Sequence, residues 1–160
     1  MRKRQINNQL SPLIKKGVRI AKLNQLEKVR SVFKENRTYF PHIRTDYLKR
    51  QIKSKKVIFH KGVVLIDSTY QRTVSLGNKQ FEKGTNIIHQ IVNSKQGNGN
   101  ATKVLKQYFK RLPNNSKCIL TVRKSNKIAR KFYKRNKFQV VGKINWSNNS
   151  IKGLIYERLI

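Results

Sequence analysis

The sequence predicts a single mixed α/β domain in which strands and helices alternate. The first observation is size, because 160 residues with 37% hydrophobic content can build one sizeable core and are too few for two. The second is the stretch from Ile87 to Leu105, which passes from a β-branched apolar run through a glycine-rich segment into residues with helical spacing. The third is a pair of hairpin signals, one at Gly62 and one at an asparagine pair near the C-terminus. We expect residues 17–160 to form this domain and the basic residues 1–16 to form an N-terminal arm.

The elements before the central stretch follow from apolar spacing and from turn residues. Alternation predicts a first strand, and spacings of three and four residues predict two helices, the second with a dense basic face. The segment 39–42, which contains a proline, breaks the helical pattern between them. In chain order, we expect a strand over residues 18–23, a helix capped by Asn24 with Leu26, Val29, Val32 and Phe33 on its inner face, a helix over 45–56, a hairpin of 57–60 and 63–67, a continuation of its second arm through 73–76, and a loop over 77–85.

The central stretch predicts a strand over residues 87–92, a turn over 96–101 and a helix after it. Glycines let the backbone come close to a ligand, and the free N–H groups and positive dipole end of a helix N-terminus suit a phosphate or pyrophosphate. The elements expected after this helix are a strand over 118–122, a short helix capped by Ser125 and Asn126, a strand over 138–141, a turn around Gly142, a strand over 144–146 and a last strand over 151–159.

The charge of the chain is far from that of an ordinary soluble enzyme. Lys and Arg total 38 against 6 Asp and Glu, which gives a formal net charge of +32. Polyanions are the obvious partners of such a protein. The alternative is a Lys-, Asn- and Ile-rich composition that reflects nucleotide bias in the encoding genome, although bias alone does not explain the shortage of carboxylates.

The chain carries one cysteine, Cys118, which excludes an internal disulfide and a cysteine-based zinc site and fits a reducing compartment. No apolar run approaches the length of a membrane span, and the basic start of the chain is followed by polar residues rather than an apolar signal core. We therefore expect a cytoplasmic protein with no metal and no membrane partner.

Two segments carry a resemblance to a known family. The first matches the pattern Gln/Arg-x-x-Gly-x-Gly/Ala through Gln96, Gly97, Gly99 and Ala101. The second matches the pattern Asn-x-x-Ala-x-x-x-Tyr with a later Phe through Asn126, Ala129, Tyr133 and Phe138. Because both occur in order and at about the family's separation, the chain from about Val18 onward resembles the GCN5-related N-acetyltransferase (GNAT) superfamily. The resemblance implies a mostly antiparallel twisted sheet of about six to seven strands, about four flanking helices and a splayed central pair of parallel strands.

The resemblance also implies an acetyl-CoA site. The pyrophosphate would rest on backbone N–H groups of Gln96, Gly97, Asn98, Gly99, Asn100 and Ala101, and the pantetheine arm would run between the strands 88–92 and 119–122. A backbone N–H near Val92 or Ile91 would hold the developing oxyanion, an effect worth roughly 3 to 4 kcal/mol per donor in comparable sites. Asn126 would lie against the pantetheine arm, and Tyr133 would be the general acid that protonates the leaving thiolate. The alternative for Tyr133 is a core residue.

The sequence leaves the general base open. His89 lies on the central strand and could assist in deprotonating an amine, or it could be a buried structural histidine. The same alternatives hold for His60 and Asp67 on the preceding hairpin. Deprotonation through water and backbone carbonyls is a further alternative, because no paired carboxylates are visible.

Two positions depart from the family's pattern. Lys137 stands before Phe138, where the family usually has glycine, so a tight helix exit has to be accommodated by Asn136 or Lys137. No proline follows Val92, which is common variation. Neither departure removes the cofactor site.

The net charge also bears on the acceptor, because a strongly positive protein repels small cationic amines. An acceptor that is nucleic acid, or a protein associated with it, is therefore expected. The residues that could neutralise phosphates are the basic ones of 49–56, Lys103, Lys106, Lys110, Arg111, Lys124, Lys127, Arg130, Lys131, Lys134 and Arg135. The aromatic residues that could stack on bases, or instead belong to the core, are Tyr39, Phe40, Tyr47, Tyr70 and Trp146.

Three other functions stay open. Small, very basic GNAT-like domains occur among phage-encoded proteins, and the phage Mom-type proteins that modify adenine in DNA are one precedent, by analogy of fold only. A non-catalytic nucleic-acid-binding protein on the same fold is the second alternative. Acetylation of a host protein or of a ribosomal component is the third.

Overall fold

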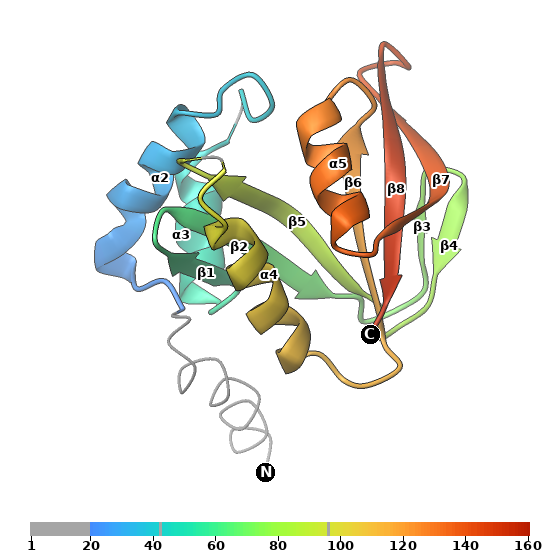
Figure 1. The fold of residues 1–160 in the computed structure, drawn as a ribbon, viewed down its shortest axis with the longest axis horizontal. Coiled ribbons are helices and arrows are strands. Elements are labelled where there is room, and N and C mark those ends of the chain that lie inside the picture. The colour runs from blue at the N-terminus through green and yellow to red at the C-terminus, as the bar shows by residue number, and fades with distance from the viewer. Residues whose placement is uncertain (1–19, 42, 96) are drawn as a thin grey trace. The chain divides into compact units, whose positions relative to one another are not determined.

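The computed structural model describes residues 20–41, 43–95 and 97–160 (Figure 1). The N-terminal arm expected over residues 1–16 and the predicted site residue Gln96 lie outside the described residues. The helices are η1 (Leu23–Gln25, a 3-10 turn), α2 (Leu26–Lys34), α3 (Thr45–Lys53), α4 (Asn100–Arg111) and α5 (Lys127–Arg135). The strands are β1 (Val57–His60), β2 (Val63–Thr69), β3 (Val74–Leu76), β4 (Lys79–Phe81), β5 (Asn86–Asn93), β6 (Lys117–Arg123), β7 (Gln139–Trp146) and β8 (Ile151–Leu159).

Hydrogen bonding orders six of the strands as β1-β2-β5-β6-β8-β7, and β3 and β4 form a separate two-stranded sheet. Strands β5 and β6 are parallel, with Asn86–Ile88 opposite residues 118–120, whereas β1 with β2, β6 with β8, and β7 with β8 are antiparallel. The expected fold class, a mixed and mostly antiparallel sheet with a central parallel pair and flanking helices, is confirmed.

Backbone contacts divide the chain into two compact units. Unit 1 comprises the described residues up to Asp67 together with those from Gln90 to Arg111, and unit 2 comprises Ser68–His89 and Leu112–Ile160.

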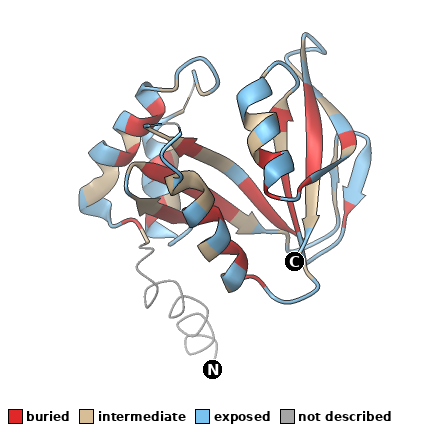
Figure 2. Cartoon of the chain, viewed as in Figure 1, coloured by how far each residue is buried: buried red, intermediate tan, exposed pale blue. Residues whose placement is uncertain are grey.

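Unit 1 is built on the apolar faces of two amphipathic helices. The buried side chains of α2 and α3 pack with those of β1, β2 and the end of β5, and the opposite helix faces are exposed (Figure 2). The predicted hairpin of β1 and β2 is confirmed, and it turns through Lys61 (φ 48°) and Gly62 (φ 77°). The carbonyl of Gly62 accepts a hydrogen bond from the N–H of Ser94 at 3.0 Å. A Cβ at Gly62 would collide with Ser94 Oγ, so glycine is needed here both for the turn and for the contact with the end of β5.

In unit 2, helix α5 packs on strands β6 and β8. Tyr133 of α5 contacts Tyr156 of β8 at a ring separation of 6.0 Å, in line with the position of α5 in Figure 1. On another part of this unit, Phe81, Ile87, Ile119 and Ile155 form a buried cluster. The asparagine-rich loop expected before β8 is confirmed, with Asn148 and Asn149 in the left-handed region.

The start of the described chain differs from the expected strand and helix cap. Ile20 forms a single bridge to Ile58, and Leu23 already begins the 3-10 turn, so the described part of the expected strand over 18–23 is wrong. Asn24 lies inside that turn and does not cap α2. The physical reason is that Gln25 Oε1 accepts the N–H of Lys22 at 2.9 Å, which tightens the chain one turn before α2. The following helices are confirmed, although α3 ends at Lys53 rather than Lys56.

The expected loop over residues 77–85 contains a strand. Val74–Leu76 pairs with Lys79–Phe81 around Gly77 (φ 55°), so β3 belongs to its own hairpin and does not continue β2. The sequence of this segment does not indicate a strand, because Phe81 is the only buried residue of β4 and no alternation of apolar and polar residues is visible.

The expected turn around Gly142 is also wrong. Strand β7 continues through this position with an irregularity between Val140 and Gly142. A Cβ at Gly142 would lie 2.7 Å from Asn78 Oδ1, and the same Asn78 oxygen accepts the N–H of Lys143 at 2.8 Å. The glycine therefore makes room for the β3–β4 hairpin rather than for a turn.

Among the described residues, no helix combines the length and the apolar character needed to cross a membrane.

Candidate functional site

The turn between β5 and α4 has the backbone conformation expected of a ligand-binding loop. Gly97 and Gly99 have φ values of 82° and 78°, in the left-handed region that side chains rarely adopt. A Cβ built on either glycine would meet no atom within 4 Å. Glycine therefore fits this backbone conformation without strain, and it leaves this side of the turn open.

The first turn of α4 has backbone N–H groups that no described residue accepts. The N–H of Asn100 donates to Asn98 Oδ1 at 3.0 Å, and the N–H of Lys103 donates to the carbonyl of Gly99 at 3.1 Å. Within the described part of the chain, the N–H groups of Ala101 and Thr102 have no acceptor. Ala101 is therefore available to an anion, whereas the amide of Asn100 is already used by the side chain of Asn98.

The end of β5 that leads into this turn is fixed by core packing and by hydrogen bonds within unit 1. Val92 is buried in the core of the unit, and Ile91 is half-buried. After Asn93 the chain is fixed by the Ser94 to Gly62 hydrogen bond and by Asn93 itself, whose Oδ1 accepts the N–H of Lys95 at 3.1 Å. Strand and turn are thus positioned by contacts that do not involve a ligand.

Helix α5 in unit 2 begins and ends with defined caps. Asn126 Oδ1 accepts the N–H of Ala129 at 3.2 Å, so the predicted N-cap is confirmed. At the other end, Phe138 N–H donates to the carbonyl of Tyr133 at 3.0 Å and Lys137 N–H donates to that of Lys134 at 3.1 Å, which is the Schellman arrangement. Lys137 adopts φ 66°, so lysine, one of the two residues expected to accommodate the tight helix exit, takes the left-handed position.

Tyr133 of α5 lies in a cluster of aromatic side chains. Its ring is 5.7 Å from Phe138 and 6.0 Å from Tyr156, and the residue is 7% exposed. Burial, and then the nearby Cys118 thiol, raise the pKa of Tyr133 well above its usual value. Among the described residues, no group hydrogen-bonds the Tyr133 hydroxyl. The side chain is therefore a core residue whose hydroxyl is protonated at neutral pH, which excludes a role as a base.

His89 is exposed on β5, so it is not a buried structural histidine. Its Nε2 lies 2.6 Å from Ser68 Oγ of β2, and both residues belong to unit 2. The serine hydroxyl fixes the orientation of the imidazole, as an orienting partner of a base does.

Asp67 and His60, the other two candidates for a base, lie on the β1–β2 hairpin. Asp67 is 3% exposed, accepts a hydrogen bond from the Tyr108 hydroxyl at 3.0 Å and lies 3.8 Å from the guanidinium of Arg111. Its carboxylate is thus committed to a buried contact between β2 and α4. His60 is half-buried on β1. The ion pair with Asp67 occupies Arg111, one of the residues expected to neutralise phosphate.

The predicted site residues are distributed over the two units. Ile91, Val92, Gly97, Asn98, Gly99, Asn100 and Ala101 belong to unit 1, and His89, Asn126 and Tyr133 belong to unit 2. Within each unit the residues are positioned by the contacts described above.

No protein-family model matches this sequence, and no curated protein matches it either. Solved structures do match. A GNAT-family acetyltransferase from Bacillus cereus has a TM-score of 0.68 at 17% identity, over 89% of this chain and 95% of that one. Naa20 from Chaetomium thermophilum, solved with a bisubstrate analogue, has a TM-score of 0.73 at 10% identity, over 89% and 86%. The NatB acetyltransferase complex bound to CoA and MES has a TM-score of 0.66 at 11% identity, over 89% and 98%.

The chain therefore has the fold of the GNAT acetyltransferases. At these low identities the likeness shows the fold, and the chemistry has to be inferred from the residues of this chain.

Proposed function

We propose that this protein is an acyl-CoA-dependent N-acetyltransferase that transfers an acetyl group from acetyl-CoA to a primary amine. The observation that carries the proposal is the turn at the start of α4, where Gly97 and Gly99 have positive φ and the N–H groups of Ala101 and Thr102 have no acceptor among the described residues. A turn of this kind, in this fold, fits the pyrophosphate of acetyl-CoA.

Each remaining site residue has one task in the proposed reaction. When bound, acetyl-CoA supplies the activated acetyl group as a thioester. The backbone N–H of Val92 or Ile91 donates to the carbonyl oxygen that becomes negative, and Asn126 binds the pantetheine arm. His89, oriented by Ser68, accepts a proton from the acceptor amine. The Tyr133 hydroxyl, which is protonated at neutral pH, donates a proton to the leaving sulfur.

We propose nucleic acid, or a protein associated with it, as the acceptor, in a reducing cytoplasmic compartment. The net charge of +32 supports this acceptor class, because it attracts polyanions and repels small cationic amines. Of the residues expected to contact phosphate, Arg111 and Arg130 are half-buried and the others are exposed, namely the basic ones of 49–56, Lys103, Lys106, Lys110, Lys124, Lys127, Lys131, Lys134 and Arg135.

The test has two parts. Titration with acetyl-CoA by calorimetry decides the cofactor, and absence of binding at millimolar acetyl-CoA would refute the enzyme proposal. Incubation of the protein with labelled acetyl-CoA in a lysate, followed by separation of protein, nucleic acid and small molecules, identifies the acceptor class.

The same charge favours one rival, a non-catalytic nucleic-acid-binding protein on this fold. It predicts salt-sensitive binding of nucleic acid without acetyl-CoA affinity. A Mom-like modification of DNA bases is distinguished by label on purified DNA rather than on protein.

A further inference from the structure

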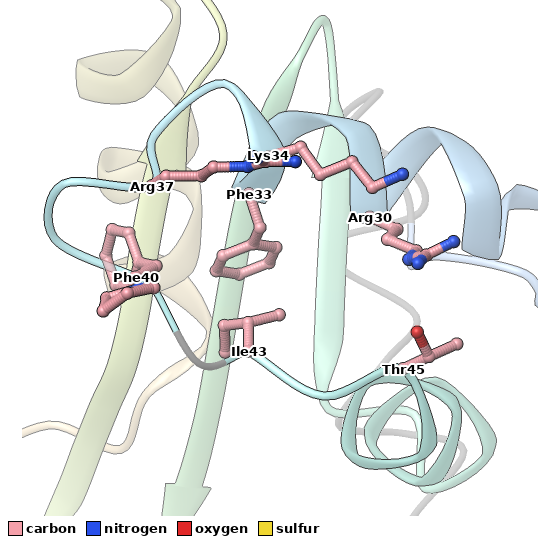
Figure 3. Close-up of a pocket in the computed structure, with 8 residues that line it drawn as sticks. Arg30, Phe33, Lys34, Arg37, Phe40, Ile43 and Thr45 are labelled. Carbon is pink, nitrogen blue, oxygen red and sulfur yellow. The ribbon is translucent and has the colours of Figure 1, made fainter.

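A pocket in unit 1, of about 260 Å³, is formed where the chain passes from α2 to α3 (Figure 3). Its lining residues are Arg30, Phe33, Lys34, Arg37, Phe40, Pro41, Ile43 and Thr45. The volume lies just below the range of about 300–1,000 Å³ that is usual for small-molecule sites. It therefore suits one unit of a longer chain better than a complete coenzyme.

The floor of the pocket is apolar and packed on the core. Phe33 is 2% exposed, and its ring meets Phe40 edge to face at 5.4 Å and 85°. Both rings and Ile43 pack on the core of unit 1, so Phe40 is held in place while part of it stays exposed. A fixed aromatic ring in a hollow is a stacking surface that needs no ordering when a planar ligand arrives.

The rim of the pocket is basic. Arg30, Lys34 and Arg37 follow one another at spacings of four and three residues, and Figure 3 shows Lys34 and Arg37 extending above Phe33. None of the described lining residues is acidic. Lys34 and Arg37 have no ion pair within the described part of the chain, and Arg30 has only Glu27 at 3.6 Å, whose side chain is 76% exposed. Such an exposed pair is weak, so the rim is positive.

The pocket and the glycine turn are linked within the same unit. Asn36, which lies between Lys34 and Arg37, donates from Nδ2 to the carbonyl of Asn93 at 3.5 Å. Asn93 ends β5 and precedes the turn assigned to acetyl-CoA.

We propose that this pocket binds one nucleotide unit of a single-stranded nucleic acid, with the base against Phe40 and the adjoining phosphates at Lys34 and Arg37. The cations match phosphate, and the aromatic floor matches a base face. In a duplex the base faces are covered by their neighbours, so a ring set in a hollow reaches only an unpaired base. An acidic peptide would use the rim but not the floor. This proposal rests on the proposed function for the class of acceptor, nucleic acid. It adds a site on unit 1 at which that acceptor binds.

The test is binding of a fluorescent single-stranded oligonucleotide of twelve or so bases, measured by anisotropy from low to moderate salt. We expect the double variant Lys34→Ala/Arg37→Ala to lower affinity at least tenfold at low salt. The slope of log affinity against log salt should fall by about 1.4, because single strands contribute about 0.7 per phosphate contact. Phe40→Leu should lower affinity by about fivefold or more and leave the slope unchanged, because it removes stacking but no charge.

A matched control removes two charges from the same unit outside the pocket, through Lys22→Ala/Lys28→Ala, at two exposed positions that neither line the pocket nor belong to the residues expected to contact phosphate. An equal loss of affinity in this control would overturn the proposal, as would an unchanged affinity in Phe40→Leu, or competition by polyglutamate as strong as that by the oligonucleotide. Because Phe40 packs on the core, its variant is compared with wild type by melting temperature. Crosslinking of a thiouridine-containing oligonucleotide to the wild-type segment around Phe40 gives a second readout.

Acetyl-CoA binding is measured on the same proteins. Oligonucleotide binding at the pocket without acetyl-CoA binding would refute the transferase proposal and leave the pocket assignment standing. The reverse result would refute only the pocket assignment.

Discussion

The turn before α4 and the exit of α5 require the same unusual backbone conformation and meet it with different residues. Gly97 and Gly99 have φ values of 82° and 78°, and Lys137 has a φ value of 66°. At Lys137 the conformation is held by the Schellman hydrogen bonds at Phe138 and Lys137, and the side chain points away from the core. At the glycines the space beside the backbone is open. A positive φ therefore does not by itself demand glycine, and glycine in the turn has the second effect of leaving the backbone amides accessible.

The largest expected effect concerns the α5 side of this comparison. Tyr133→Phe should lower kcat by about 100- to 10,000-fold, the range for loss of a general acid, with acetyl-CoA affinity within about twofold of wild type. The raised pKa of Tyr133 keeps its hydroxyl protonated at neutral pH, so its titration should not limit the rate there. Steady-state kinetics and calorimetry measure the two quantities. Tyr156→Phe is the matched control, because it removes a hydroxyl from the same aromatic cluster.

The next effect concerns the turn. Gly99→Val should raise the acetyl-CoA Kd at least tenfold, because a β-branched residue strains this conformation and its side chain covers the open side of the backbone. Gly84→Val is the control, since Gly84 has φ 91°, also faces open space and lies in an exposed loop of unit 2. Equal losses of acetyl-CoA affinity in the two variants would mean that the effect is general strain and not a ligand contact.

A smaller effect is expected at the start of α5. Asn126→Ala should lower the free energy of unfolding by about 1 kcal/mol, because the N–H of Ala129 loses its acceptor. Asn126→Asp keeps an acceptor and should recover most of that stability. Urea denaturation of both variants measures the free energy of unfolding. An Asn126→Ala protein with the same free energy of unfolding as wild type would show that the cap contributes nothing to stability.

The sequence was informative wherever local chemistry decides the structure. The cap at Asn126, the strand, glycine turn and helix from Asn86 to Arg111, and the β1–β2 hairpin all follow from signals within a few residues. The errors occurred where distant residues decide. Gly142 leaves room for the side chain of Asn78 and does not form a turn. Phe81 is the only buried residue of β4, so the sequence gives little sign of that strand.

The pocket in unit 1 was not predicted, although part of its signal was present. Arg30 and Lys34 are four residues apart on α2, and Arg37 follows three residues after the end of the helix. What the sequence could not supply was the return of Phe40 onto Phe33, because that contact depends on how the segment between the helices folds over the core. For the same reason, the commitment of Asp67 to Tyr108 and Arg111 was not visible, since these residues are about 40 positions apart in the chain.

The smallest expected effect concerns Lys137, which adopts a positive φ at the exit of α5 where the turn before α4 has glycine. Lys137→Gly should raise the free energy of unfolding by roughly 0.5 to 1 kcal/mol. The left-handed conformation costs a residue with a side chain about 1–2 kcal/mol, and glycine avoids this cost. Part of the gain is lost because glycine also raises the conformational entropy of the unfolded chain. Lys131→Gly, at an exposed position inside α5, removes the same charge and should instead lower stability by about 1 kcal/mol. Opposite signs in the two variants would establish that backbone conformation, and not the lost lysine charge, determines the result. If both variants were destabilised, the Schellman hydrogen bonds would have to depend on the lysine itself, and the contrast with the glycine turn would fail.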